Sequence, residues 1–395
     1  MLKAADALAL AGYDVRVVAT IHEPWAVAAD ADARSRRTWP VTSVDHRRGE
    51  GGSTYWWTGM QHRAARALAR TAGADRVPLP VAARAFGRVH SALVRAILAA
   101  PSDLIYGGTT GALAAIAEAG RRSSTPYALD LEDFHSGEAS GPNARFVDAL
   151  AVRIERSVLH DAVFVTTSSE AIAAEYRSVH AVDAAVIHNT FLLPSRPPDF
   201  GRADPSRLRF YWFSQTIGPE RGLDEAVAAI GRVGSPARLT LLGRPHGSFL
   251  EQLRGSARRL APQLEVVHQA PLPPDAMIDA ARGHDIGLAL EMSPPRNREI
   301  CLANKALTYI LAGLPLLLAD TEGQHGLGVE LGRGAALVDP RDIDAVARAI
   351  GQWAADPAAL ECAKRTAWHH AARRWHFDHD AERGVLYRLI GEALA

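Results

Sequence analysis

Apolar residues follow two alternating patterns along this chain. Short runs rich in β-branched residues predict strands, and the Ala-rich stretches between them have the apolar spacing of helices. The alternation predicts an α/β fold of mostly parallel sheets covered by helices on both faces. The strands expected in the first half are Val15–Thr20, Leu104–Tyr106, Tyr127–Leu131 and Val163–Thr167, with helices over Val81–Ala99 and Ala144–Leu159. Those expected in the second half are Leu208–Phe213, Arg238–Leu242, Leu264–His268, Ile286–Leu290, Leu314–Ala319 and Ala335–Val338.

The length of 395 residues favours two domains, because a single hydrophobic core rarely grows so large. A proline-rich segment without apolar periodicity lies midway and is typical of a linker. We therefore expect two Rossmann-like, doubly wound domains. The predicted divisions are residues 1–192, a linker over 193–206, a second domain over 207–370, and a final helix over 371–395 that packs back on the first domain.

The first residues read as a helix rather than as the strand that opens a doubly wound domain. Met1–Ala11 has the spacing of a helix that packs on a sheet, and Gly12 suits its C-terminal end. Without the opening strand, two strand edges in the middle of the sheet would be unpaired. We expect either that the protein starts upstream of Met1, so that the first strand is missing here, or that another strand fills this position.

Composition excludes several classes of function. Lys plus Arg equals Asp plus Glu at 44 each, so no overall charge favours nucleic acid or an anionic membrane. Two isolated cysteines, Cys301 and Cys362, argue against a disulfide framework or a structural zinc site. The N-terminal residues lack the apolar core of a signal peptide, so we expect a cytoplasmic protein. Peripheral association with the inner face of the membrane is compatible with these features.

The segment ANKALTYILAGLPLLLAD, residues 303–320, carries the clearest chemistry. It predicts a helix from about Lys305 to Leu311, with Asn304 as its N-cap, after which Gly313 and Pro315 lead into a buried strand. A helix N-terminus presents free N–H groups and a partial positive charge, to which Lys305 adds a full charge. The segment is therefore either a diphosphate site or an ordinary capped helix that packs on its sheet.

This segment resembles the donor-site helix and strand of the retaining GT-B glycosyltransferases of family 4, or group 1. Further segments resemble the same family in the same order: YALDLEDFHSGE, SSEAIAAEY and VIHNTF in the first half, and FYWFSQTIGPERGLDEAVAAI and TLLGRPHG in the second half. The resemblance implies a two-domain GT-B enzyme that transfers a sugar from a UDP-, GDP- or ADP-sugar. The implied acceptor is a glycan, a lipid-linked molecule or a small molecule, and no cofactor, metal ion or nucleic acid is implied.

The chain departs from the family at the glutamates that hold the donor. The second of these two positions is Thr308, whose hydroxyl offers one neutral contact to a ribose in place of a carboxylate. The first falls at Ile300, next to Glu299, while Glu291 ends the preceding strand. We favour Glu291 as the catalytic carboxylate, because the carboxyl end of a parallel strand faces the ligand crevice. For both glutamates, the alternative is a solvated loop carboxylate.

The family's basic pair beside the diphosphate is also altered. Ser214 and Arg221 stand at those positions, so neutralisation of the diphosphate would depend on Arg221 together with Lys305. Gly243 lies in the glycine turn that follows the next strand, and Arg244 after it is a third candidate cation. An exposed arginine without a ligand is the alternative for Arg244.

Titratable residues are dense after the strand Tyr127–Leu131. Asp133 and His135 are the candidate catalytic residues there, with Asp130, Glu132 and Glu138 around them. His135 would act as a general base or bind a sugar hydroxyl, and Asp133 would orient it or deprotonate an acceptor. The alternative is a turn whose side chains satisfy one another.

Two further features have a structural and a functional interpretation. Tyr55, Trp56 and Trp57 are expected in a loop over residues 41–60, where they either stack on a sugar or anchor the loop. Glu155, between two arginines, is expected in a network of salt bridges on a helix surface.

The expected activity is thus glycosyl transfer. Two rivals are a GT-B sugar-nucleotide epimerase, which needs no acceptor, and a binding or scaffold protein derived from a glycosyltransferase. Thr308, Ser214 and the absent first strand motivate the second rival.

Overall fold

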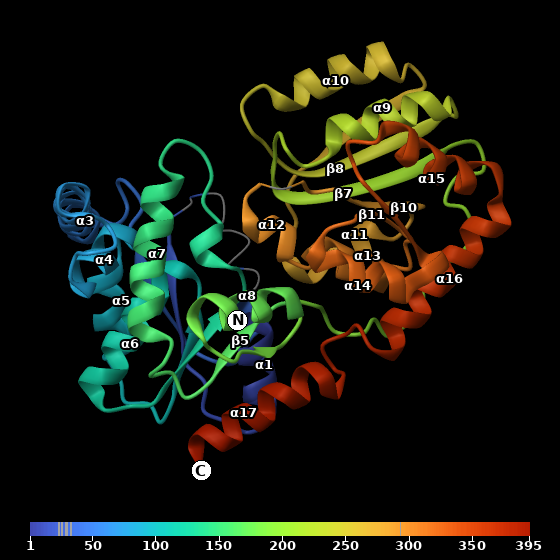
Figure 1. The fold of residues 1–395 in the computed structure, drawn as a ribbon. Coiled ribbons are helices and arrows are strands. Elements are labelled where there is room, and N and C mark those ends of the chain that lie inside the picture. The colour runs from blue at the N-terminus through green and yellow to red at the C-terminus, as the bar shows by residue number, and fades with distance from the viewer. Residues whose placement is uncertain (23, 25–26, 28–30, 32–33, 293) are drawn as a thin grey trace. The chain divides into compact units, whose positions relative to one another are not determined.

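The computed structural model describes residues 1–395 except 23, 25–26, 28–30, 32–33 and 293 (Figure 1). The chain forms two compact units. Unit 1 comprises Met1–His188, Pro294–Asn297 and Asp380–Ala395, and unit 2 comprises Asn189–Ser293 and Arg298–His379. Within the described residues, no helix is long and apolar enough to cross a membrane.

Unit 1 alternates strands and helices. Its strands are β1 (Val17–Ile21), β2 (Val41–Asp45), β3 (Ile105–Gly108), β4 (Tyr127–Leu131), β5 (Val165–Thr167) and β6 (Ala185–Val186). Its helices are α1 (Leu2–Leu10), α3 (Gly52–Ala72), α4 (Leu79–Phe86), α5 (His90–Ile97), α6 (Thr110–Ser123), α7 (Ala144–Val158), α8 (Glu170–His180) and α17 (Val385–Leu394). A π-helical segment over Asp380–Gly384 precedes α17.

The strands of unit 1 form two parallel sheets, β1-β2 and β3-β4-β5-β6. In the part of the chain that the structure describes, β1 and β3 pair on one side only. The buried residues Val44, Leu93 and Ala115 form part of a core between the first sheet and helices α5 and α6. The hydroxyl of Tyr387 in α17 donates to the Ala7 carbonyl of α1 at 3.0 Å, which joins the two ends of this unit.

Two sequence predictions for this unit were wrong. The stretch expected as one helix over Val81–Ala99 is α4 and α5, separated at Gly87, where a Cβ atom would lie 2.8 Å from the Gly111 carbonyl oxygen. The stretch expected as a loop over residues 41–60 contains strand β2 and the start of α3. Gly51 is the N-cap of α3 and Gly52 is its first residue, so these glycines lie at the start of the helix rather than in a loop.

Unit 2 is a doubly wound domain. Its strands are β7 (Leu208–Ile217), β8 (Ala237–Pro245), β9 (Leu264–Gln269), β10 (Ile286–Ala289), β11 (Leu316–Ala319) and β12 (Ala335–Val338). Its helices are α9 (Leu223–Val233), α10 (Phe249–Leu260), α11 (Met277–Ala281), α13 (Asn304–Leu311), α14 (Glu322–Leu331), α15 (Ile343–Ala355) and α16 (Pro357–Arg373). The short helix α12 (Arg296–Ile300) contains residues of both units.

All six strands of unit 2 are parallel, in the order β12-β11-β10-β7-β8-β9. Alternate residues of β7 enter two cores: Phe210 and Trp212 belong to one, and Tyr211 belongs to the other. The first core includes residues of α9, α10 and α15, and the second includes residues of α13, α14 and α16. Both faces of the sheet are therefore covered, as the apolar runs of the sequence predict.

Candidate active site

The strand order of unit 2 reverses between β7 and β10. From β7 the chain proceeds outward through β8 and β9, and then returns to β10 on the other side of β7. In doubly wound sheets the crevice at the carboxyl ends of such strands is the usual ligand site. Ser214 and Arg221 follow the centre of β7, and Glu291 follows β10, so these predicted residues lie on the segments that border the reversal.

The loop after β7 packs closely against the end of β10. Gly222 has a φ of +72°, and a Cβ atom there would lie 2.3 Å from the carbonyl oxygen of Leu290. Only glycine fits this approach, which brings the neighbouring Arg221 next to the segment that carries Glu291. Arg221 is half-buried. On the other side of the loop, Gly243 has a φ of +150°, and a Cβ there would lie 2.3 Å from the Ser214 carbonyl oxygen.

Glu291 and Lys305 form a buried ion pair. The Lys305 ammonium group donates to Oε1 of Glu291, and the two residues are 8% and 6% exposed. The ammonium nitrogen also lies 5.3 Å from the centre of the Trp212 ring. The second oxygen of Glu291, Oε2, is buried and has no hydrogen-bond partner among the described residues. A buried carboxylate oxygen without a donor is costly, so this atom is suited to receive a hydroxyl group from a ligand.

The start of helix α13 differs from the prediction. Asn304 is its first residue rather than its N-cap; the N-cap is Ala303, which makes no side-chain capping bond. The Asn304 side chain is exposed, and the first N–H groups of the helix are not capped by a side chain. Thr308 is fully buried, and its hydroxyl donates to the Asn304 carbonyl at 3.0 Å. The Thr308 hydroxyl is thus already bonded within its own helix. A role for Thr308 in binding a ribose stays a prediction.

Glu299 has a structural partner. Its Oε1 accepts a hydrogen bond of 3.4 Å from the N–H of Glu322, the first residue of α14. A carboxylate at a helix N-terminus is stabilised by the helix dipole. This contact favours Glu299 as a capping residue, and its proposed contact with the donor stays a prediction.

Arg244 is one of the last residues of β8, where it pairs in register with Thr216 of β7.

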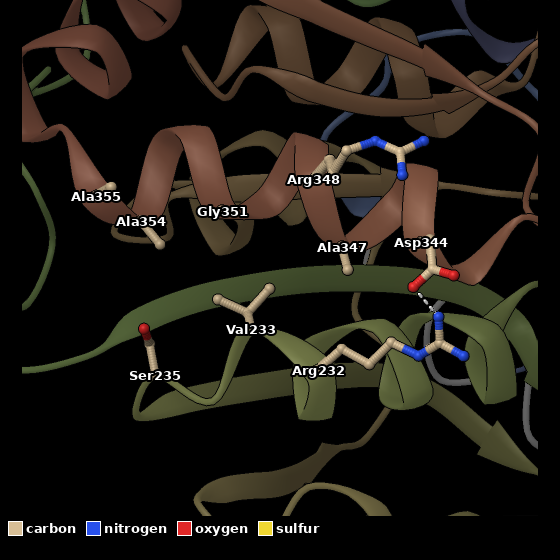
Figure 2. A pocket seen from close by; sticks show the side chains of 9 residues that line it. All are labelled: Arg232, Val233, Ser235, Asp344, Ala347, Arg348, Gly351, Ala354 and Ala355. Atoms are coloured by element: carbon tan, nitrogen blue, oxygen red, sulfur yellow. Dashed lines mark hydrogen bonds and ion pairs between the residues drawn. The ribbon is translucent and has the colours of Figure 1, made fainter.

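A groove of about 490 Å³ opens elsewhere on unit 2, between the C-terminal part of α9 and helix α15. Figure 2 shows Arg232 and Asp344 joined by an ion pair at one end, with small side chains of α15 along the wall. Val233 and Ser235 of this groove directly precede β8. The groove therefore lies at the amino ends of the strands, away from Glu291 and Lys305, and we place no nucleotide there.

In unit 1 the predicted catalytic loop follows β4. Oδ1 of Asp133 accepts a hydrogen bond of 2.8 Å from the amide nitrogen of Asn297, and Oδ1 of Asn297 accepts one of 2.8 Å from the N–H of Phe134. Asn297 is buried, and it belongs to the four residues from the second half of the chain that form part of unit 1. Burial raises the pKa of Asp133, while the bond from Asn297 acts in the opposite direction.

His135 is buried beside Asp133, with one free ring nitrogen. Its Nδ1 lies 3.3 Å from Oε2 of Glu138, and its Nε2 has no hydrogen-bond partner among the described residues. Burial lowers the pKa of His135, but the hydrogen bond and the charge of Glu138 outweigh burial and raise it above its usual value. A protonated His135 would donate through Nε2 rather than accept a proton there.

A buried polar cluster holds this loop from behind. The hydroxyl of Tyr176 accepts from the N–H of His135 at 3.1 Å and lies 2.9 Å from Oε1 of Glu155. Oε2 of Glu155 lies 3.1 Å from Nε2 of His180. Glu155 is fully buried, so the expected surface network of salt bridges around it was wrong. Burial acts to raise the pKa of Glu155, but hydrogen bonds from His180 and Ser136 lower it overall.

Asp133, His135, Glu291 and Lys305 stay candidate residues, and the sequence does not indicate the side chains that contact them. Asn297 is distant in sequence from Asp133, Tyr176 from His135, and Trp212 from Lys305, although each pair is in contact. No local sequence pattern indicates these residues. They reach the candidate residues only through the packing of strands and helices that are distant in sequence. In the described part of the chain, no group of three or more His, Cys, Asp or Glu side chains could hold a metal ion.

No protein-family model matches the sequence, and no curated protein matches it. Solved structures do match over nearly its whole length. A sucrose-phosphate synthase from Thermosynechococcus elongatus superposes with a TM-score of 0.72 at 15% identity, covering 99% of this chain and 92% of that protein. The chain has the GT-B fold.

Other proteins with the GT-B fold give similar values. Anabaena HepE in complex with UDP and glucose matches with a TM-score of 0.63 at 18% identity, covering 96% of this chain and 99% of that one. Trehalose-6-phosphate synthase from E. coli, bound with UDP-2-fluoro glucose, matches with a TM-score of 0.60 at 14% identity and the same coverage. The predicted fold class is therefore confirmed.

Proposed function

We propose that this protein is a glycosyltransferase that transfers a sugar from a nucleotide-sugar donor to an acceptor hydroxyl group. The observation that carries the proposal is the Glu291–Lys305 pair next to the strand reversal of unit 2, in a chain with the GT-B fold. HepE and trehalose-6-phosphate synthase have this fold and were solved with UDP or with UDP-sugars. These complexes favour a UDP-sugar as the donor.

The donor would bind unit 2. Arg221 and Lys305 would neutralise the diphosphate, assisted by the uncapped N–H groups of α13. Oε2 of Glu291, which has no donor among the described residues, would accept a hydrogen bond from a sugar hydroxyl. Ser214, Gly243 and Arg244 are proposed as further contacts from the ends of β7 and β8.

The acceptor would bind unit 1. In the reaction, the acceptor oxygen bonds to the anomeric carbon while the bond from that carbon to the diphosphate oxygen breaks. The electron pair of the broken bond leaves on the nucleoside diphosphate, and the acceptor hydroxyl loses its proton. Asp133 is the proposed base, because burial raises its pKa and so makes it a stronger proton acceptor. His135, with its raised pKa, would donate a hydrogen bond to the acceptor.

A titration with UDP-, GDP- and ADP-sugars tests the donor site. We expect one nucleotide to bind, and Arg221→Ala to weaken its binding about tenfold or more, because a charge-assisted contact is lost. Arg348→Ala is the matched control: Arg348 is exposed on α15 of the same unit, in the groove at the amino ends of the strands. Equal affinity of both variants and the unaltered protein would contradict the placement of the diphosphate.

One observation favours a second candidate function, a nucleotide-sugar-binding protein without transfer. Thr308 replaces the family's second glutamate, and its hydroxyl is bonded within α13. Slow hydrolysis of the bound donor, in which water replaces the acceptor, separates the two candidates. Release of nucleoside diphosphate that is lost in Asp133→Asn supports transfer, whereas binding without any release supports the binding protein.

A further inference from the structure

Helix α3 of unit 1 carries large apolar side chains on its outer face. Trp56, Trp57, Met60 and Leu68 are 69%, 52%, 50% and 49% exposed. Their spacing of three and four residues, together with the exposed Ala64 and Ala67, places them on one side of the helix. Figure 1 shows α3 beside α4 at the edge of unit 1. An ordinary surface helix presents polar residues on this side.

The inner face of α3 is already used for packing. Thr58, Ala65 and Ala69 are buried on the opposite side of the helix. The Arg88 guanidinium donates to the Tyr55 carbonyl at 2.6 Å and lies 4.1 Å from the Tyr55 ring centre. The outer apolar stripe is therefore not needed to hold the helix on its own unit.

The charges next to the stripe are all positive. Residues 52–72 contain Arg63, Arg66 and Arg70 but no Asp or Glu, in a chain whose basic and acidic residues balance at 44 each. Arg66 and Arg70 lie with their guanidinium groups 5.0 and 5.3 Å from the Phe146 ring centre. Burial and the charge of Arg70 lower the pKa of Arg66. Arg63 and Arg70 are exposed and fall along one edge of the stripe by their helical spacing.

The apolar stripe and the arginine edge of α3 together indicate what binds this surface. Tryptophan rings settle at the boundary between lipid head groups and acyl chains, and arginine binds phosphate groups through several donors. A helix with an exposed apolar stripe, an arginine edge and no acid has the pattern of an interfacial helix on an anionic membrane. A second copy of the chain is disfavoured, because in a symmetric contact through this face the arginines of each helix would meet a helix without any acidic residue.

We propose that the outer face of α3 docks on the surface of an anionic lipid bilayer. Trp56, Trp57, Met60 and Leu68 enter the head-group boundary, and Arg63 and Arg70 contact lipid phosphates. The helix lies along the membrane and does not cross it. This proposal does not depend on the donor site in unit 2 or on the identity of the transferred sugar.

Cosedimentation of the full chain with sucrose-loaded vesicles tests the docking. We expect binding to vesicles of phosphatidylcholine with 30% phosphatidylglycerol, weaker binding to phosphatidylcholine alone, and a loss of binding as salt rises. The double variant Trp56→Ser/Trp57→Ser removes insertion, and Arg63→Gln/Arg70→Gln removes the phosphate contacts. Each should weaken binding to the anionic vesicles at least tenfold.

A matched control comes from unit 2. Val329 is 62% exposed, and Arg348 is exposed on α15, so Val329→Ser/Arg348→Gln removes one exposed apolar and one basic side chain elsewhere. This control should bind vesicles as the unaltered protein does. Thermal unfolding and circular dichroism check that all variants remain folded, which is expected because the replaced side chains are exposed.

Two results would overturn the proposal. The first is the absence of binding to anionic vesicles, or binding that both α3 variants retain. The second is a dimer in sedimentation velocity that Trp56→Ser/Trp57→Ser abolishes, without any vesicle binding, since the stripe would then be covered by a second copy.

Discussion

The Lys305 ammonium group is bonded to the Glu291 carboxylate and lies over the Trp212 ring. The charge of Lys305 is therefore matched by Glu291. A diphosphate that approaches Lys305 must share it with this carboxylate. The pair thus joins the group that would hold the diphosphate to the group that would hold the sugar.

Glu291→Gln separates these two roles. It keeps the size of the side chain but removes the negative charge, so Lys305 becomes more available to phosphate. We expect the free nucleoside diphosphate to bind roughly three- to tenfold more tightly, an effect on the order of 1 kcal/mol. Hydrolysis of the donor should fall at least tenfold, because the carboxylate proposed to hold the sugar loses its charge. Glu251→Gln, at an exposed position on α10, is the control. If Glu291→Gln raised or lowered both the affinity for the nucleoside diphosphate and the rate of donor hydrolysis, the division of roles would be refuted.

Asn297→Ala removes the donor to Asp133 and the acceptor for the Phe134 N–H. The bond from Asn297 lowers the pKa of Asp133, so its removal lets burial raise that pKa further. Asp133 must be ionised to act as a base, and activity is lost as pH falls through its pKa. The acidic limb of the pH profile of donor hydrolysis should therefore move to higher pH.

The same variant should lose about 1–3 kcal/mol of unfolding free energy, the usual cost of leaving a buried partner unpaired. Asn143→Ala, at an exposed position without a side-chain capping bond, is the matched control for both measurements. An unchanged pH profile in Asn297→Ala would show that Asn297 has only a structural role.

His188 should make stability depend on pH above neutrality. Burial acts to lower its pKa, but hydrogen bonds to Glu170 and Glu382 raise that pKa from its usual 6.5 to about 9. The folded state then binds this proton more tightly than the unfolded state. The stabilisation is complete below pH 6.5 and is lost as pH rises to about 9, amounting to roughly 1–3 kcal/mol.

Urea unfolding at several pH values measures this slope, and His188→Asn should remove it. Lys3 acts in the opposite sense: burial lowers its pKa from 10.5 to about 8, so its penalty fades as pH rises between these values. That contribution should remain in the variant. The interpretation fails if His188→Asn keeps the decline between pH 6.5 and 9.

Lys364→Met tests a buried ion pair in unit 2. The Lys364 ammonium donates to Asp285 at 2.9 Å, and the two side chains are 2% and 0% exposed. Asp285 also accepts from the N–H groups of Ala203 and Arg209, so removal of the lysine leaves a buried charge short of a partner. We expect a loss of about 3–5 kcal/mol in unfolding free energy.

The matched control for this pair is the next residue on the same helix. Arg365→Met breaks an exposed pair with Glu361 and should cost at most about 0.5 kcal/mol. Chemical unfolding of both variants measures the difference, and similar losses would show that burial does not govern the cost.

The sequence predicted the strands of unit 2 well because several of them, such as β10 and β11, are continuous apolar runs. It failed at residues 41–60, where β2 is short and half-exposed and α3 starts without a side-chain cap. The outward Trp56 and Trp57 do not follow the usual amphipathic pattern, so the sequence predicts aromatic residues of a loop there. Local signals were insufficient because both faces of α3 are apolar.

The candidate site was predictable only where one segment carries the chemistry. Asp133, His135, Glu291 and Lys305 stand at strand ends or at a helix start, which the sequence marks. Asn297 was not found, because its contact with Asp133 depends on a four-residue stretch, Pro294–Asn297, that belongs to unit 1 although the chain around it belongs to unit 2. Such a long-range contact leaves no periodic signal.

The makeup of unit 1 has a consequence for protein synthesis. Its last segment, Asp380–Ala395, supplies Tyr387 to α1 and the carboxylate of Glu382 to the N–H of His188. A ribosome produces these partners only after all of unit 2 has been made. The first 188 residues must therefore wait, incompletely folded, until translation reaches α17. Although it is mostly made first, unit 1 is the last to finish folding, and it depends most on protection from aggregation while nascent.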